Sequence, residues 1–172
     1  MKTQITDGII QSWSFPQENF GYTAHGLLVP PFPPSNALII GYGQGTVAGL
    51  IKLIWGTQVE IMGVDLVKSE LNGYDDFWCG DANAFVKKYC LNRYDFVVID
   101  LYNGRLIPTF VFEEEFVKAI AKITRKLLAV NITFYKELDF GIYGEHFIPD
   151  AVKTVNQDRV LFLSPKSIDL KV

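Results

Sequence analysis

Three glycines at alternating positions are the first residues in this sequence whose type and spacing could serve chemistry. Gly41, Gly43 and Gly45 follow the apolar run ALII and precede a second apolar run, TVAGLIKLIW. Glycine tolerates positive φ and lets a ligand approach the backbone closely. A helix that begins directly after such a turn aims its N-terminal amides and the positive end of its dipole at the same place. The turn therefore predicts a site for a nucleotide-like ligand; a tight turn with nothing bound is the alternative.

Three aspartates stand where neighbouring strands are expected to end. Asp65 closes VEIMGVD, Asp81 closes DDFWCGD, and Asp100 follows the apolar core of YDFVVIDLY. In an open α/β sheet, ligands bind beyond the carboxyl ends of the strands. We therefore expect these three carboxylates to meet the glycine turn in one crevice.

Two ligand classes compete for this arrangement. A dinucleotide site needs G-x-G-x-x-G and an acidic residue about 20 positions further on. Gly41, Gly43 and Asp65 meet part of that pattern, but Thr46 stands where the third glycine would fall. The other class is S-adenosylmethionine, with the glycine turn against its amino-acid part, Asp65 on the ribose hydroxyls and Asp81 near the adenine.

The elements that must position these residues alternate between strands and helices. We expect strands in NALIIGYG, VEIMGVD, DDFWCGD, YDFVVIDLY and LLAVNITF, and helices in TVAGLIKLIW, ANAFVKKYC and FEEEFVKAIAKITRK. We expect a last helix fragment and two mutually antiparallel strands within HFIPDAVKTVN and RVLFLSP. This alternation predicts one doubly wound α/β domain with a mainly parallel seven-stranded sheet and an antiparallel last strand.

The segment before Ala37 has a different character. VPPFPPS holds four prolines, which do not fit inside a helix or a central strand. Upstream of it, DGIIQSW is a candidate strand and YTAHGLL a candidate short helix. We predict an N-terminal extension over residues 1–36, the remnant of a lid or hairpin, and a cofactor-binding domain over residues 37–172.

Composition and charge narrow the function classes. The chain has 172 residues, of which 49% are hydrophobic and 20% charged, as in ordinary globular proteins. A net charge of −3 does not indicate the basic surface that nucleic-acid binding requires. No apolar run approaches the roughly 20 residues that cross a bilayer, and the N-terminus lacks the apolar core of a signal peptide. We expect a cytoplasmic protein with no nucleic-acid or membrane partner.

No metal site is expected from the sequence. Cys79 and Cys90 lack the spacing of metal ligands. The three glutamates at positions 113–115 are expected in the first turn of a helix, where negative charge suits the dipole.

Several stretches, in this order, resemble the spermidine synthase-like branch of the class I S-adenosylmethionine-dependent methyltransferases. GYTAHGLLVPPFPPSNALIIGYGQGT is similar to the family's tyrosine-bearing helix, first strand and glycine turn. VEIMGVD resembles its ribose-binding strand, CGDANAFV its adenine-supporting segment, and YDFVVIDLYNG the strand with the catalytic aspartate. IPTFVFEEEFVKAIAKITRKLLAVNIT resembles the helix and strand that follow. The resemblance covers roughly residues 21–133 and implies the Rossmann-like fold of that superfamily.

The resemblance also implies roles for individual residues. The residues that would hold S-adenosylmethionine, or its decarboxylated form, are Gly41, Tyr42, Gly43, Gln44, Gly45, Asp65, Leu66, Asp81 and Ala82. Tyr22, Tyr102 and Asn103 would line the site of a small-molecule acceptor, and His25 would lie near its mouth. Asp100 would orient or deprotonate the acceptor, because the matching aspartate of aminopropyltransferases accepts a proton from an amine. A homodimer is plausible for this branch.

The chain departs from that family in four ways. Gln44 and Asn103 each stand where the synthases carry aspartate. The segment from Asp65 to Asp81 is short, so its helix must be abbreviated, which puts the adenine pocket in doubt. Finally, 36 N-terminal residues are too few for the synthases' β-rich domain.

The departure at Gln44 decides which transfer we expect. A neutral glutamine loses an ion pair with the lone ammonium of a decarboxylated cofactor but does not repel a carboxylate, so it favours ordinary S-adenosylmethionine. We therefore expect methyl transfer to a small molecule. Aminopropyl transfer, a non-catalytic binding module and a nicotinamide dinucleotide binder remain as alternatives.

Overall fold

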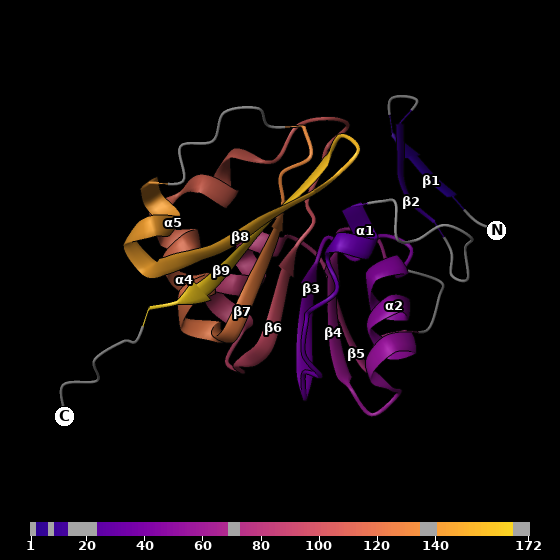
Figure 1. Cartoon of the computed structure of the whole chain (residues 1–172), viewed down its shortest axis with the longest axis horizontal. Helices are drawn as coiled ribbons and strands as arrows, with labels where there is room; N and C mark the ends of the chain where they lie inside the picture. The colour runs from indigo at the N-terminus through magenta and orange to yellow at the C-terminus, as the bar shows by residue number, and fades with distance from the viewer. Residues whose placement is uncertain (1–2, 7–8, 14–23, 69–72, 135–140, 167–172) are drawn as a thin grey trace.

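A seven-stranded sheet forms the centre of the molecule (Figure 1). The structure is a computed structural model, which describes residues 3–6, 9–13, 24–68, 73–134 and 141–166. The strands of this sheet are β3 (Asn36–Ile40), β4 (Glu60–Asp65), β5 (Asp76–Cys79), β6 (Tyr94–Ile99), β7 (Thr124–Asn131), β8 (Phe147–Val155) and β9 (Asp158–Pro165). Their order across the sheet is β5-β4-β3-β6-β7-β9-β8. Strands β3 to β7 pair in parallel, and β9 runs antiparallel to both β7 and β8. The predicted sheet is thus confirmed.

Helices cover both faces of the sheet, as strands that are apolar on both faces require. All six residues of β6 and four of the five residues of β3 are buried. Helices α1 (Ala24–Leu27) and α2 (Thr46–Trp55) pack on one face. Helices α4 (Glu114–Ile123) and α5 (Gly141–His146) pack on the other face (Figure 1). The predicted doubly wound architecture is therefore confirmed.

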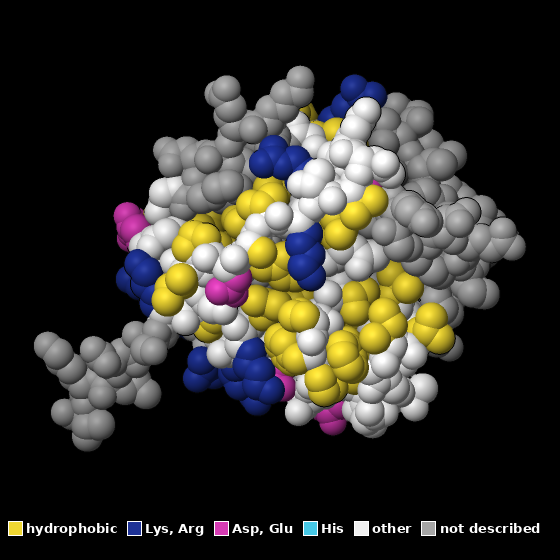
Figure 2. All heavy atoms as spheres, viewed as in Figure 1, with side chains coloured by type: hydrophobic (Ala, Val, Ile, Leu, Met, Phe, Trp, Pro, Cys, Tyr) yellow, Lys and Arg dark blue, Asp and Glu magenta, His cyan; other side chains and the backbone are white. Residues whose placement is uncertain are grey.

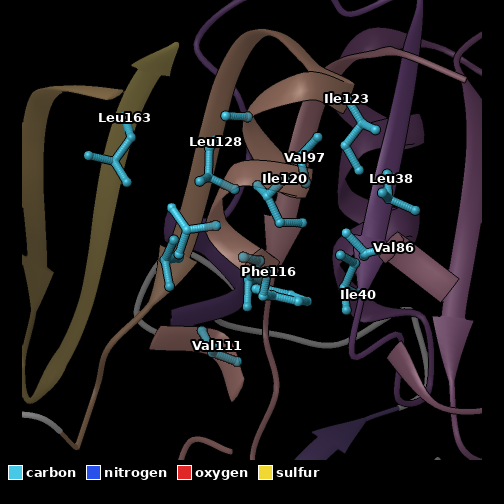
Figure 3. Packing of buried hydrophobic residues seen from close by; sticks show 14 of the residues in the cluster. Leu38, Ile40, Val86, Val97, Val111, Phe116, Ile120, Ile123, Leu128 and Leu163 are labelled. Carbon is cyan, nitrogen blue, oxygen red and sulfur yellow. The ribbon is translucent and has the colours of Figure 1, made fainter. Parts of the chain in front are cut away.

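The larger of the two buried clusters lies between the sheet and α4. Figure 3 shows Phe116 and Ile120 of α4 pointing toward the sheet, where they share this cluster with Val97 and Leu128. Phe116, Ile120, Val97 and Leu128 have no exposed surface. Burying a side chain of this size stabilises a fold by about 1.5–3 kcal/mol. This cluster therefore holds α4 against β6 and β7.

The N-terminal segment forms a small sheet of its own. Strands β1 (Thr3–Thr6) and β2 (Ile9–Trp13) pair antiparallel, and in Figure 1 they lie toward the end of the molecule at which β6 and β7 finish. The strand predicted in DGIIQSW and the short helix predicted in YTAHGLL are both present in the described residues. The division at residue 36 into an extension and a domain stays a prediction.

Several predicted boundaries were wrong. The helix expected over residues 112–126 covers only Glu114–Ile123, after a 3-10 turn over Thr109–Phe112. It stops because Thr124 takes an extended conformation and already pairs with Tyr94 as the first residue of β7. The strand expected over residues 127–134 is consequently shifted toward the N-terminus.

The predictions for residues 75–90 and 146–156 also need correction. The strand expected to end at Asp81 ends at Cys79. The helix expected in ANAFVKKYC is a short helix α3 (Ala82–Ala84) followed by a π-helical turn over Phe85–Tyr89. The last helix fragment is α5, which ends at His146, so most of HFIPDAVKTVN is strand β8.

The connection from β4 to β5 contains no helix within the part that the structure describes, residues 66–68 and 73–75. This agrees with the short spacing in the sequence. Figure 2 shows apolar side chains gathered on the face where α2 lies in Figure 1, and Leu53 and Ile54 of α2 are more than half exposed. None of the helices in the described part of the chain is long and apolar enough to cross a membrane.

Candidate active site at the carboxyl ends of the strands

The carboxyl ends of four neighbouring strands, β5, β4, β3 and β6, meet around one cavity of about 400 Å³. Ligand pockets in proteins are about 300–1,000 Å³. The cavity is lined by His25, Gly41, Tyr42, Gly43, Thr46, Val47, Asp65, Leu66, Gly80, Asp81, Ala82, Asp100, Leu101, Tyr102, Asn103, Pro108 and Phe110. Each of the four strands therefore contributes at least one loop residue to the same hollow.

The glycine turn after β3 forms one wall, and its conformation requires glycine. Gly41, Gly43 and Gly45 have φ values of 86°, 54° and 81°. The amide of Gly41 donates to the carbonyl of Val64 at 2.9 Å, which joins the turn to the end of β4. A Cβ atom on Gly41 would lie 2.2 Å from the carbonyl oxygen of Asp100. A side chain at this position would push the turn away from β6.

Tyr42 supports the turn from behind. Although Tyr42 lines the cavity, its ring makes edge-on contacts with Tyr74 and Phe77, with centroids 5.5 Å apart in each case. Burial raises the pKa of the Tyr42 hydroxyl far above its usual range, and the neighbouring Tyr74 adds to the effect. A Cβ atom on Gly45 would lie 3.0 Å from this ring. Tyr42 therefore packs under the turn with its hydroxyl protonated, and its predicted contact with the cofactor stays a prediction.

Asp65, the last residue of β4, holds the glycine turn and the next loop together. Its Oδ2 accepts a hydrogen bond from the Gly43 amide at 2.7 Å, and its Oδ1 accepts one from the Val67 amide at 3.3 Å. Carboxylate oxygens accept more than one hydrogen bond each. Asp65 can therefore keep these contacts and also accept hydrogen bonds from ligand hydroxyls.

Asp81 has a structural contact of its own. Its Oδ1 accepts a hydrogen bond from the Ala84 amide at 2.7 Å and so caps the N-terminus of α3. This is the usual use of aspartate at a helix start. Asp81 also lines the cavity beside Gly80 and Ala82, so the cap fixes its position at the wall.

Asp100 follows β6 and lies almost fully buried at the cavity. Its Oδ1 accepts a hydrogen bond from Asn131 Nδ2 at 2.8 Å. Its Oδ2 is 3.7 Å from His25 Nε2, and the two side chains are 9% and 10% exposed. Helix α1 thus brings a histidine from the N-terminal segment to the end of β6, in contact with the carboxylate.

The surroundings of Asp100 favour its protonated form. Burial is the largest cause and raises the pKa of the Asp100 carboxyl above its ordinary value. His25 and the hydrogen bond from Asn131 oppose this shift, whereas Asp158 and Asp65 add to it. A buried carboxyl with a raised pKa beside a histidine is typical of functional sites.

Tyr102 and Thr133 orient Asn131. The one hydrogen of the Tyr102 hydroxyl is shared between the Asn131 carbonyl at 2.9 Å and Asn131 Oδ1 at 3.1 Å, and the Thr133 hydroxyl and amide donate to Oδ1 at 2.6 and 3.1 Å. Because Oδ1 accepts these bonds, the amide nitrogen of Asn131 is the atom that faces Asp100. Tyr102 therefore has an indirect role in holding the carboxylate.

The structure brings most of the predicted site residues together. All predicted cofactor residues except Gln44 and Gly45 line the cavity, as do the predicted acceptor residues Tyr102 and Asn103 and the predicted catalytic residue Asp100. Tyr22 lies outside the described residues. Gly41 and Gly43 are the residues by which the turn lines the cavity, and the predicted contacts of Gln44 and Gly45 with a ligand stay predictions.

Sequence reasoning missed two partners of Asp100 and several wall residues. Asn131 could have been found, because Ile99 and Val130 pair in parallel and the residues after them must be neighbours. The contact between His25 and Asp100 depends on how α1 docks, for which the sequence has no local signal. The remaining unpredicted wall residues are Thr46, Val47, Gly80, Leu101, Pro108 and Phe110.

Comparison with known proteins gives a consistent but distant set of likenesses. No family model matches the sequence. A polyamine aminopropyltransferase from Vibrio vulnificus (strain CMCP6) is 34% identical over 106 residues, covering 55% of this chain and 35% of that protein. This chain therefore spans about a third of the length of the curated relative that it matches.

Solved structures share the fold at low sequence identity. TrmN from Thermus thermophilus superposes with a TM-score of 0.61 at 16% identity, covering 83% of this chain and 47% of that one. A probable spermidine synthase from Corynebacterium glutamicum gives 0.57 at 15% identity, covering 75% and 55%. Fibrillarin from Aeropyrum pernix, solved with natively bound S-adenosyl-L-methionine, gives 0.59 at 14% identity, covering 81% and 72%. The chain has the class I S-adenosylmethionine-dependent methyltransferase fold.

Proposed function

We propose that this protein binds S-adenosylmethionine, or a close analogue, in the cavity at the strand ends and transfers its methyl group to a small-molecule acceptor. One observation carries the proposal: the glycine turn, Asp65, the Asp81–Ala82 corner and Asp100 line a single cavity of about 400 Å³. The fold is that of proteins which bind this cofactor, as the fibrillarin complex illustrates. Fold alone does not fix a reaction, so the site must carry the argument.

The residues at the cavity fit such a cofactor. Gly41 and Gly43 line the cavity without a side chain, so a ligand can approach the backbone of the turn. Asp65 would accept hydrogen bonds from the ribose hydroxyls, and Asp81 would accept one from the adenine amine. Leu66 and Phe110 would supply apolar walls for the adenine ring. When bound, the cofactor supplies an electrophilic carbon on a positively charged sulfur.

Asp100 would hold the acceptor and take its proton. A nucleophile that still carries its proton reacts poorly, and a positioned base near the reacting atom typically contributes 10²–10⁴-fold. The raised pKa of Asp100 makes its carboxylate a stronger base than an exposed aspartate. Asn131 holds one carboxylate oxygen in place, so the other oxygen is available to the acceptor.

Methyl transfer is favoured over aminopropyl transfer by the charges at the site. Gln44 and Asn103 are neutral, whereas the family pattern has aspartate at both positions. Asn103 lines the cavity, so its missing charge is felt directly by an acceptor, whereas Gln44 could act only through the turn. Aminopropyl transfer remains the second candidate, because the curated relative at 34% identity is a polyamine aminopropyltransferase.

Titration calorimetry on the purified chain tests this proposal. The ligands are S-adenosylmethionine, decarboxylated S-adenosylmethionine, 5′-methylthioadenosine and NAD. We expect saturable binding of S-adenosylmethionine at least ten-fold tighter than binding of the decarboxylated form, and no binding of NAD. Tighter binding of the decarboxylated form would favour aminopropyl transfer, and no response to any adenosyl sulfur compound would overturn the proposal.

If S-adenosylmethionine binds but no acceptor is ever methylated, the chain is a binding module of the same fold. A screen with methyl-labelled S-adenosylmethionine and pools of small metabolites separates this outcome. Retention of label in the cofactor alone, across pools that contain hydroxyl, amine and thiol compounds, would contradict turnover. Asp100→Asn is the matched control, because it keeps the size of the side chain but removes the base.

A further inference from the structure

The amino ends of the parallel strands form an edge of the sheet that the proposed function does not involve. Strands β3 to β7 all begin at this edge, in the spatial order β5-β4-β3-β6-β7. Neighbouring strands lie about 4.8 Å apart, so the five starting points span about 19 Å. The side chains around these points differ in charge from one end of the row to the other.

Acidic side chains gather where β4 and β5 begin. Glu60 and Asp76 are the first residues of these strands, and Asp75 precedes Asp76. All three line a hollow of about 570 Å³, and none of its lining residues in the described part of the chain is Lys or Arg. Lys52 pairs with Asp75 at 2.9 Å. Three carboxylates and one ammonium group leave two negative charges at this acidic end of the row.

Basic side chains gather where β6 and β7 begin. Arg93 precedes β6, and Arg125 and Lys126 are the second and third residues of β7. Arg125 and Lys126 pair with Asp95, whose side chain is buried. Three cations and one carboxylate leave two positive charges at this basic end of the row. Figure 2 shows Lys and Arg side chains gathered at the lower edge of the molecule, where β6 and β7 begin in Figure 1.

A neutral residue separates the two ends. Asn36, the first residue of β3, donates from Nδ2 to the Arg93 carbonyl at 3.2 Å, and its Oδ1 accepts from the Asp95 amide at 2.9 Å. The centres of the two ends are three strand spacings, or about 14 Å, apart. This distance exceeds the Debye length of about 8 Å at physiological ionic strength. Within one copy, the acidic and the basic end therefore do not neutralise each other.

The loop before β6 adds an exposed apolar side chain to this edge. Leu91 is 91% exposed and lines the hollow together with Asn92 and Tyr94. A single exposed leucine is common on protein surfaces. This one lies beside the acidic hollow and two residues before Arg93 of the basic end. Interfaces between proteins typically cover apolar side chains at their centre and charged ones at their rim.

From this arrangement we infer that the edge at the amino ends is an interface between two copies of this chain, related by a two-fold axis near β3. Such an axis places the acidic end of each copy against the basic end of the other, so both contacts join unlike charges. The arginine side chains of one copy would face the acidic hollow of the other, and Leu91 of each copy would be covered. The cavity at the carboxyl ends would stay open, because it lies at the opposite edge. The inference does not depend on the proposed function.

Association through this edge should be weak and sensitive to salt. Exposed ion pairs contribute little one at a time, so the attraction must come from two pairs of charged ends together. Salt screens exposed charges within a few ångströms at high ionic strength. We therefore expect the dissociation constant of the dimer to rise at least about ten-fold between 25 and 300 mM NaCl.

Sedimentation equilibrium of the whole chain tests the inference. We expect an equilibrium between monomer and dimer in 25 mM NaCl that shifts to monomer in 300 mM NaCl. A mass of one chain at all concentrations up to about 0.5 mM in 25 mM NaCl would overturn the inference. Species larger than a dimer would overturn the two-fold arrangement, because a head-to-tail contact does not close on itself.

Two reversals of charge test the pairing of unlike ends. Glu60→Lys removes the net charge of the acidic end, and Arg93→Glu removes that of the basic end without touching the pairs of Arg125 and Lys126 with Asp95. We expect each variant alone to raise the dissociation constant at least ten-fold. An equimolar mixture should associate more tightly than either variant, because the unchanged basic end of one meets the unchanged acidic end of the other. A mixture that associates no better than its components would contradict the pairing.

Matched controls carry the same changes of charge away from this edge. Glu114→Lys lies at the start of α4, next to the turn whose Phe110 lines the cavity at the carboxyl ends. Lys153→Glu lies in β8, close to its turn into β9. Both should leave the dissociation constant unchanged, alone and when mixed. Losses equal to those of Glu60→Lys and Arg93→Glu would mean that net charge, and not this edge, governs association.

A change without charge separates the apolar contribution. Leu91→Ser should raise the dissociation constant about ten-fold, because one apolar side chain of each copy loses its cover. Leu106→Ser, at a leucine that is 68% exposed in the connection from β6 to α4, should leave it unchanged. Equal effects of the two substitutions would place the interface elsewhere. Thermal unfolding of dilute samples checks that each variant is folded, and Asp76→Lys replaces Glu60→Lys if that variant is not.

Discussion

Strand β6 has an aspartate near each end, and the two side chains lie in opposite surroundings. At the amino end, Asp95 Oδ2 accepts hydrogen bonds from Lys126 Nζ at 2.9 Å and from the Ser35 amide at 3.1 Å, and Arg125 lies 3.4 Å from Oδ1. At the carboxyl end, Asp100 has Asn131 and a histidine that is 3.7 Å away. Both carboxylates are less than a tenth exposed.

This contrast appears in the pKa of each carboxyl group. Burial alone would raise both. At Asp95 the Ser35 amide and Lys126 outweigh burial and lower the pKa, whereas at Asp100 burial prevails and the pKa is raised. At the amino end of the strand, the carboxylate thus stabilises the fold through its ion pairs and hydrogen bonds. The carboxyl end keeps one that is costly to ionise, which is the pattern expected of a functional group.

The size of a cavity does not distinguish the two ends. A hollow of about 570 Å³ lies at the amino ends of the strands, against Glu60, Asp76 and Tyr94. It is larger than the cavity at the carboxyl ends. What differs is the backbone, because the glycine turn with three positive φ values faces the carboxyl-end cavity.

The largest effect is expected at the glycine turn. Gly41→Ala places a methyl group 2.2 Å from the Asp100 carbonyl oxygen at a φ of 86°. Strain and overpacking together should lower the free energy of unfolding by about 2–4 kcal/mol. Gly144→Ala in α5, where a Cβ atom would meet nothing within 4 Å, should be neutral or stabilise by up to about 1 kcal/mol. Urea denaturation measures both, and similar values for the two variants would contradict the close approach of the turn to β6.

Asp95→Asn, at the amino end of β6, should lower the free energy of unfolding. Loss of the charge on a carboxylate with three partners should cost about 2 kcal/mol near pH 7. Because the folded pKa of Asp95 is lowered, its contribution exists above the unfolded pKa of about 3.9 and is lost as the pH falls through the folded value. The difference between wild type and variant in urea denaturation should therefore shrink toward pH 3. A difference that does not depend on pH would exclude the ion pairs as its cause.

Asp65→Asn should weaken cofactor binding. Loss of a charged acceptor for the ribose hydroxyls should reduce the affinity for S-adenosylmethionine by about 10–100-fold. Asp76→Asn, the same substitution at the start of β5, should leave the affinity unchanged because Asp76 is exposed at the opposite end of the sheet. Calorimetry compares the two, and an equal loss in both would place binding elsewhere.

Asp100→Asn should have the smallest effect and the opposite sign to Asp95→Asn. Because the folded pKa of Asp100 is raised, the unfolded chain ionises first as the pH rises, and the folded protein loses stability. A neutral asparagine removes this loss. We expect the Tm of the variant to exceed that of wild type by about 2–4 °C at pH 7.5 and by less at pH 4. A lower Tm at pH 7.5 would mean that His25 and Asn131 outweigh burial.

Most of the fold and the outline of the site could be predicted from sequence. The buried runs of β3 and β6 have no polar interruption except Asp95, so their strand character was plain. The rule that parallel strands deliver their carboxyl ends to one edge then placed Asp65 and Asp100 near the glycine turn. These are consequences of local pattern and topology.

The remaining details depend on tertiary packing. Thr124 is compatible with a helix end or with a strand, and its pairing with Tyr94 decides in favour of the strand. Asp81 could cap a helix or face a ligand, and its bond to the Ala84 amide shows that it caps α3. Contact between His25 and Asp100 arises from the docking of a four-residue helix, which no periodicity reveals.

We propose that the ligand binds at the carboxyl ends of the strands and not at the larger hollow opposite. Backbone amide NMR of the wild-type protein with S-adenosylmethionine tests it most directly. We predict that the amides of Gly43, Asp65 and Ala82 shift saturably while those of Glu60 and Asp76 remain in place. Saturable shifts confined to Glu60 and Asp76, or an absence of any shift at Gly43, would show that the ligand binds elsewhere.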